Sequence, residues 1–134
     1  MPNQIMRKIM KETQTIAVVG LSSRKTRAGY YVPAYLQQNG YRIIPVNPNL
    51  MEALGERAYT HLSDIPETVD LVLIFQRSEN VPPFVDEAIQ IRAKAVWMQL
   101  GIASPTAAAK AQAAGLDVVQ NACLMVEHRA WDGS

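Results

Sequence analysis

The sequence has a single cysteine, Cys123, and almost no excess of either charge. With one cysteine, the chain can form neither an internal disulfide nor a zinc site built from several cysteines. Its 13 Lys and Arg residues and 12 Asp and Glu residues leave a net charge of +1. This balance disfavours a protein whose whole surface follows nucleic acid. Any preference for anions must therefore be local.

Long apolar runs are also missing. No stretch approaches the roughly 20 apolar residues that a membrane-spanning helix needs, so we expect no membrane partner. The first residues, MPNQIMRKIMKE, lack the apolar core of a signal peptide. Together these absences favour a cytoplasmic protein.

The apolar residues that are present suffice for one core. Hydrophobic residues make up 49% and charged residues 19% of 134 residues, a composition typical of folded rather than disordered chains. No repeat, linker or low-complexity segment divides the chain. We therefore expect a single domain over residues 1–134.

Strand and helix patterns alternate along the chain. Short apolar runs predict buried strands at 15–20, 41–46, 70–75, 95–100 and 116–120. Helical patterns occupy 1–14, 30–40, 82–92, 104–115 and 121–131. The intervening segment 47–69 is rich in turn residues, with one short strand expected near 57–59. This alternation predicts right-handed βαβ units, and therefore an α/β, Rossmann-like, doubly wound domain with a mainly parallel sheet of five or six strands flanked by helices.

Capping residues mark several helix ends. Asn3 is a candidate N-cap of the first helix, and Ser104 is the candidate N-cap of the helix at 104–115. Gly115 follows that helix as its stop signal. Pro33 is expected in a first helical turn, because a proline has no amide hydrogen; this expectation starts its helix near residues 29–31.

The stretch AVVGLSSRKTRAGYY, residues 17–31, joins a predicted strand to a predicted helix. Ligands of such sheets bind outside the carboxyl ends of the strands, here the loops at 20–30, 47–49, 75–81, 99–104 and 120–123. A glycine at the strand end lets a phosphate approach the backbone, and the following helix N-terminus offers free N–H groups. The loop adds hydroxyls and cations, namely Ser22, Ser23, Arg24, Lys25 and Arg27. It predicts a site for a polyanionic phosphorylated ligand; the alternative is a solvated surface loop.

The motif is not that of an NAD site. A dinucleotide fingerprint reads G-x-G-x-x-G and is followed by an acidic residue after the second strand. Here only Gly20-x-Ser22 is present, and Asn47-Pro48-Asn49 ends the second strand without a carboxylate. NADP, whose 2′-phosphate prefers cations, stays open as an alternative. No phosphate-binding loop of the G-x-x-x-x-G-K-[ST] type occurs.

Four segments together resemble a known family. They are AVVGLSSRKTRAGYYVPAYLQQNGYRIIPVNP, VDLVLIFQRSENVP, AVWMQLGI and AAGLDVVQNACLMVEH, which span Thr15 to His128. In order and spacing they resemble the small single-domain CoA-binding proteins, whose fold is similar to the N-terminal CoA-binding domain of the succinyl-CoA synthetase α subunit. The resemblance implies a Rossmann-like domain that holds coenzyme A along the carboxyl edge of its sheet.

The resemblance also implies roles for individual residues. The phosphates of the 3′-phospho-ADP portion would meet Gly20, Ser22, Ser23, Arg24, Lys25 and Arg27. The nucleotide would be bordered by Asn47 and Pro48. The next wall, where the adenine or the start of the pantetheine arm could lie, would consist of Phe75, Gln76, Arg77 and Val81.

No catalytic or metal-binding constellation is expected. Adjacent helix residues such as Glu127 and His128 point about 100° apart, which disfavours an acid–base pair. His61 lies alone in a turn-rich segment, and a metal site needs more ligands than these. Cys123 is expected to be an inert, half-buried thiol, the alternative being thiol exchange with coenzyme A.

These observations predict a stand-alone protein that binds CoA or acyl-CoA without catalytic machinery of its own. Two alternatives stay open: an NADP-binding Rossmann protein or accessory subunit of a reductase, and an interaction module that binds no nucleotide. A protein partner or a homo-oligomer is compatible with each of the three.

Overall fold

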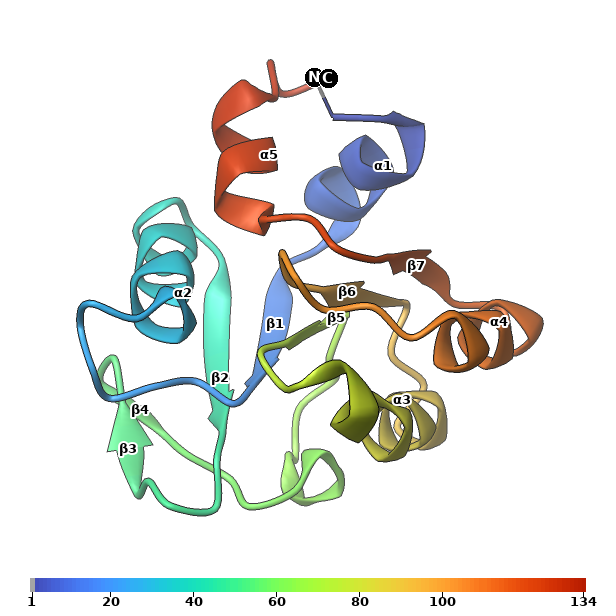
Figure 1. Ribbon diagram of the computed structural model, residues 1–134. Coiled ribbons are helices and arrows are strands. Elements are labelled where there is room, and N and C mark those ends of the chain that lie inside the picture. Colours follow the sequence, from blue (N-terminus) through green and yellow to red (C-terminus); the bar gives the residue numbers. More distant parts are fainter. Residues whose placement is uncertain (1) are drawn as a thin grey trace.

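The computed structural model describes residues 2–134 and has a five-stranded parallel sheet at its centre (Figure 1). The strands are β1 (Thr15–Val19), β2 (Arg42–Val46), β5 (Leu71–Ile74), β6 (Ala95–Met98) and β7 (Asp117–Val119). Their order across the sheet is β2-β1-β5-β6-β7. The chain runs outward from β1 to β2 and then returns past β1 to β5, so the direction of winding reverses between β1 and β5. Such a switch point is where doubly wound sheets bind ligands.

Helices cover both faces of the sheet. They are α1 (Gln4–Glu12), α2 (Ala28–Gln38), α3 (Val81–Gln90), α4 (Pro105–Ala113) and α5 (Leu124–Ala130). Two short 3₁₀ turns, η1 (Leu62–Asp64) and η2 (Ser78–Asn80), lie in the connections. In Figure 1, α1, α2 and α5 lie on one face, and α3 and α4 lie on the other. This arrangement confirms the predicted Rossmann-like α/β fold, with five strands.

Each strand contributes to two cores. In β1, Ala17 and Val19 pack with α3 and α4, whereas Ile16 and Val18 pack with α1, α2 and α5. All four side chains are at most 1% exposed. Because both faces are covered, alternating side chains are buried equally. This explains why the strands read as continuous apolar runs rather than as an alternating pattern.

The predicted caps form hydrogen bonds. The Asn3 side chain accepts from the Met6 amide at 2.9 Å, and the Ser104 hydroxyl accepts from the Ala107 amide at 3.4 Å. The second helix, α2, begins at Ala28, immediately before the predicted start near residues 29–31. The start at Ala28 places Pro33 in the second turn rather than the first.

A loop amide compensates for this proline. Pro33 cannot donate to the carbonyl of Gly29, four residues earlier. The Ser22 amide donates to that carbonyl instead, at 3.0 Å. The helix therefore tolerates Pro33, and the freed carbonyl ties the loop after β1 to the first turn of α2.

The segment 47–69, where one short strand was expected near 57–59, contains a two-stranded hairpin. Strands β3 (Glu52–Ala53) and β4 (Glu56–Arg57) pair antiparallel, and Tyr59 forms a parallel bridge with Val46. The turn residues Leu54 and Gly55 both have positive φ, as a two-residue hairpin turn requires. A leucine in this conformation is not a sequence signal for a turn. The Gln37 side-chain amide donates to the Leu54 carbonyl at 2.9 Å and so holds the hairpin against α2.

Two classes of feature are absent from residues 2–134. None of the helices there has the length and apolar character needed to cross a membrane. In the same range, no three His, Cys, Asp or Glu side chains gather in a way that could hold a metal ion.

Candidate functional site

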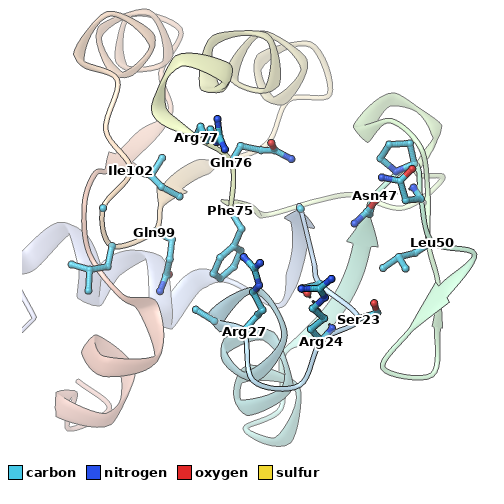
Figure 2. A pocket seen from close by; sticks show the side chains of 18 residues that line it. Ser23, Arg24, Arg27, Asn47, Leu50, Phe75, Gln76, Arg77, Gln99 and Ile102 are labelled. Carbon is cyan, nitrogen blue, oxygen red and sulfur yellow. Dashed lines mark hydrogen bonds between the residues drawn. The ribbon is translucent and has the colours of Figure 1, made fainter.

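A cleft of about 900 Å³ opens at the carboxyl ends of four adjacent strands, β2, β1, β5 and β6 (Figure 2). Residues from the loops that follow these strands line it. The cleft thus lies across the switch point between β1 and β5, at the edge where the sequence predicted a ligand.

Most of the residues predicted from the sequence line this cleft. They are Gly20, Ser22, Ser23, Arg24, Arg27, Asn47, Pro48, Phe75, Gln76 and Arg77. Two others lie elsewhere. Lys25 is exposed and does not line the cleft. Val81 is completely buried in the core beneath α3, because it begins that helix with its side chain toward the sheet.

The cleft also contains residues that were not singled out from the sequence. These are Ala28, Gly29, Asn49, Leu50, Gln99, Leu100, Gly101 and Ile102. The loop after β6 was expected at the binding edge, but nothing in its composition marked any of its residues. Its uncharged side chains become candidates only through their position.

Gly20 lets the ends of β1 and β5 approach each other. Its φ is +86°, and a Cβ built there would lie 2.4 Å from the Phe75 carbonyl oxygen. A Cβ on Gly29 would in turn lie 3.2 Å from the Gly20 carbonyl oxygen. Any larger residue at position 20 would displace backbone, so this glycine is required by space as well as by conformation.

The loop between β1 and α2 exposes backbone donors. The Arg24 amide donates to the Ser22 hydroxyl at 3.1 Å, which shapes the turn. Within the described residues, the amides of Ala28 and Gly29 have no acceptor, as expected for the first residues of a helix without a side-chain cap. Both residues line the cleft, so the positive end of α2 lies beside it.

The cleft is strongly cationic. Arg24, Arg27 and Arg77 line it, and among residues 2–134 no aspartate or glutamate does. None of the three belongs to an ion pair among residues 2–134. Figure 2 shows Arg24 and Arg27 on one side of the cleft and Arg77 with Gln76 on the opposite side. Three uncompensated guanidinium groups in a chain of net charge +1 concentrate positive potential at this edge.

Asn47 holds the border of the cleft after β2. Its side-chain amide donates to the Leu21 carbonyl at 2.9 Å, and its side-chain oxygen accepts from the Asn49 amide at 2.8 Å. Both ends of the side chain are therefore engaged in shaping the loops. No carboxylate stands here to bind the two hydroxyls of a ribose, as in a typical NAD site.

The aromatic cluster around His128 and the single cysteine lie outside the cleft. The Tyr35 hydroxyl and the His128 Nδ1 are 2.8 Å apart in an aromatic cluster with Tyr41 and Trp131. Burial lowers the pKa of His128 below its ordinary value. Cys123 is partly buried at the N-terminus of α5 and packs against the core. None of these residues lines the cleft.

Known proteins resemble this chain over nearly its whole length. It is 37% identical over 123 residues to the uncharacterized protein YneT of Bacillus subtilis, an alignment that covers 92% of this chain and 91% of that protein. A solved structure from Thermus thermophilus, the cell-free protein ID.343, is 37% identical, with a TM-score of 0.90 and coverage of 97% of this chain and 98% of that one.

A more distant relative is much longer. The ADP-forming acetate–CoA ligase II of Archaeoglobus fulgidus is 34% identical over 79 residues, which are 58% of this chain but 12% of the ligase. A family model described as a CoA binding domain matches residues 14–129. This match confirms the resemblance stated from the sequence: the chain belongs to the CoA binding domain family.

Proposed function

We propose that the protein binds coenzyme A or an acyl-CoA in the cleft, with the phosphates of the 3′-phospho-ADP portion at the loop between β1 and α2. One observation carries the proposal: the cleft at the switch point is lined by three arginines and by no carboxylate. CoA brings several phosphate charges, and arginine binds phosphate oxygens in a bidentate manner.

The backbone supports the same placement. Among the described residues, the Ala28 and Gly29 amides have no acceptor, and both residues line the cleft together with Gly20. Free amides at a helix N-terminus bind phosphate without a further side chain. Arg24 and Arg27 extend from the same loop, so charge and backbone donors act on one group. The residues present therefore suit a polyanionic nucleotide.

Binding without chemistry fits the composition of the cleft. No histidine, cysteine or carboxylate lines it among the described residues, and these side chains supply most acid–base and thiol catalysis. The acetate–CoA ligase is about eight times longer than the segment it shares with this chain. We propose that the protein serves as a carrier or sensor of CoA, with any reaction performed by a partner.

NADP is the second candidate. Asn47 replaces the acidic residue that would bind both ribose hydroxyls of NAD, and the nearby arginines could instead accept a 2′-phosphate. The two cofactors differ in the position of that phosphate and in the arm beyond the pyrophosphate. A direct comparison therefore separates them.

The test is a calorimetric titration of the protein with CoA, dephospho-CoA, NADP and NAD in the same buffer. We expect CoA to bind most tightly, and dephospho-CoA to bind about tenfold more weakly or worse, because it lacks the charged 3′-phosphate. Tighter binding of NADP would favour the reductase alternative. No heat at near-millimolar CoA would overturn the proposal.

A further inference from the structure

The loop after β6 brings a buried amide to the cleft. Gln99 follows β6 directly and lines the cleft, yet only 4% of the residue is exposed. Burial of a polar side chain is costly unless its groups find partners. A side-chain atom of Gln99 that has no partner within the protein is therefore a candidate to bind a ligand group.

The orientation of this amide is determined by its neighbour. The backbone N–H of Leu124 lies 3.3 Å from the Gln99 side-chain oxygen. Because an N–H can only donate, the atom facing Leu124 must be the oxygen and not the NH₂ group. The Nε2 donor of Gln99 consequently points away from Leu124.

That Nε2 donor has no acceptor among the described residues. Within residues 2–134, the side-chain oxygen of Gln99 accepts a hydrogen bond from Leu124, whereas its Nε2 group takes part in none. Within that range, Trp131 Nε1 is the one fully enclosed side-chain polar atom without a partner, so Gln99 Nε2 remains accessible. Gln99 is one of the residues that line the cleft, so the cleft is the side from which a ligand could reach this donor.

Two hydrogen bonds to Asn121 hold the loop that follows Gln99. The Asn121 side-chain oxygen accepts from the Gly101 amide at 2.7 Å, and the Ile102 carbonyl accepts from the Asn121 amide at 3.0 Å. These bonds clamp the loop after β6 to the end of β7. The surrounding cleft surface includes the apolar side chains of Phe75, Leu100 and Ile102.

The position of Gln99 along the cleft suits the arm of the ligand. β6 is two strands away from β1 in the sheet, which is about 10 Å at the usual strand spacing. A ligand whose phosphates lie at the loop after β1 would thus reach Gln99 with the group that follows its pyrophosphate. In CoA this is the pantetheine arm, an apolar chain that carries amide carbonyls.

We infer that Gln99 Nε2 donates a hydrogen bond to a carbonyl oxygen of the ligand, in the pantetheine arm or in an acyl thioester. This inference rests on the proposed function and adds a specificity residue to it. A preorganised amide donor between apolar walls selects a ligand that has a carbonyl at that distance, and it leaves the phosphate end unaffected.

The experiment compares three ligands by calorimetry on the wild-type protein and on Gln99→Met. Adenosine 3′,5′-bisphosphate has the phosphates without the arm, CoA adds the arm amides, and acetyl-CoA adds the thioester. We expect Gln99→Met to weaken CoA or acetyl-CoA roughly tenfold and to leave the bisphosphate within about twofold. If Gln99→Met loses affinity for CoA, the hydrogen bond is assigned to an amide of the pantetheine arm. If it loses affinity for acetyl-CoA alone, the hydrogen bond is assigned to the thioester.

Two further variants test whether a loss of affinity in Gln99→Met comes from the missing donor or from a change in the structure of the loop. Asn121→Gly removes the clamp on Gly101 at a backbone of positive φ (+55°) that glycine accepts, and it leaves the Gln99 donor in place. We expect it to preserve the ratio of CoA to bisphosphate affinity. Gln99→Glu keeps an acceptor for Leu124 but has no donor, so that ratio should fall as it does in Gln99→Met.

The outcomes separate this inference from the proposed function. Equal weakening of all three ligands, or unchanged CoA and acetyl-CoA affinity in both Gln99 variants, would overturn the role of Gln99 while CoA binding stands. The same fall of the ratio in Asn121→Gly would also overturn it. Failure of the wild-type protein to bind any of the three ligands would instead overturn the proposed function, and the inference with it.

Discussion

At the scale of single residues, Gly20 determines how closely the ends of β1 and β5 can pack beside the cleft. Its amide donates to the Val46 carbonyl at 2.9 Å, so its position is tied to β2 as well as to β1. The contact that excludes a side chain there is the Phe75 carbonyl, a backbone atom that cannot swing aside. A methyl group at this position would therefore strain the sheet itself.

We expect Gly20→Ala to lower the free energy of unfolding by roughly 2 to 4 kcal/mol, from the left-handed backbone and the steric clash together. Gly40→Ala is the matched control: its φ is +94°, but nothing lies within 4 Å of a Cβ built there. The free energy of unfolding of that variant should fall by about 1 kcal/mol, which is the cost of the left-handed backbone alone. Urea denaturation of both variants measures the difference, and equal losses would show that the contact with Phe75 relaxes freely.

At the scale of elements, the loop between β1 and α2 combines its charges with the start of a helix. Arg24, Lys25 and Arg27 are all exposed, but only the two arginines line the cleft. The sequence alone cannot tell which of these three cations line the cleft, because all three lie within four positions of one turn. The path of the loop, held by the bond from the Ser22 amide to the Gly29 carbonyl, makes the distinction.

We expect the double variant Arg24→Ala/Arg27→Ala to weaken CoA binding by about tenfold or more and to reduce its dependence on salt, because charge-assisted contacts to phosphate are lost. Its free energy of unfolding should change by less than about 0.5 kcal/mol, since both side chains are exposed.

Lys25→Ala is the control in the same loop. Because Lys25 does not line the cleft, the affinity of this variant for CoA should stay within about twofold of the wild-type value. Calorimetry at two salt concentrations supplies the measurement. If Lys25→Ala weakens CoA as strongly as the double variant does, the loop acts by its overall charge and not through the two arginines of the cleft.

At the scale of the whole molecule, the cleft and the aromatic cluster around His128 are separate. The cleft spans the carboxyl ends of β2, β1, β5 and β6, whereas His128 extends from α5 to Tyr35 of α2. Tyr35 and Tyr41 face the imidazole edge-on, with ring centroids 5.4 and 5.6 Å away, and Arg129 lies over the Tyr35 ring. The cluster joins α5 to the rest of the domain, and within residues 2–134 His128 forms no ion pair with a carboxylate.

This burial makes the stability of the molecule depend on pH. The pKa of His128 lies below its ordinary value of 6.5 because burial disfavours the imidazolium. Below about pH 6.5 the unfolded chain binds a proton at His128 that the folded chain excludes, so the free energy of unfolding falls as the pH decreases from 7 to 5.

The variant His128→Phe keeps an aromatic ring in the cluster but has no group that titrates there. We expect its free energy of unfolding to depend less on pH between pH 7 and 5 than that of the wild type. His61→Gln serves as the control, since His61 is exposed. Denaturation at several pH values gives the slopes, and identical slopes for wild type and His128→Phe would contradict the assignment.

Much of this protein follows from its sequence because the signals are local. Continuous apolar runs predicted the buried strands, and Asn3 and Ser104 predicted helix starts through bonds to amides three residues away. Parallel strands bring their carboxyl ends to one edge, so the order of strands and helices along the chain was enough to place the loop after β1 at a candidate site. Ten predicted residues accordingly line one cleft.

Tertiary structure decided what depends on contacts between distant segments. Pro33 lies in a second helical turn because the Ser22 amide takes the carbonyl that it leaves free. Val81 turns into the core and Lys25 stays outside the cleft, although the sequence predicted both in loops of the binding edge. Gln99 becomes a candidate only because Leu124, 25 residues later, occupies one end of its amide. The sequence by itself thus determined the layers and the binding edge through local patterns, whereas the direction of each donor was decided by partners that only the folded chain brings near.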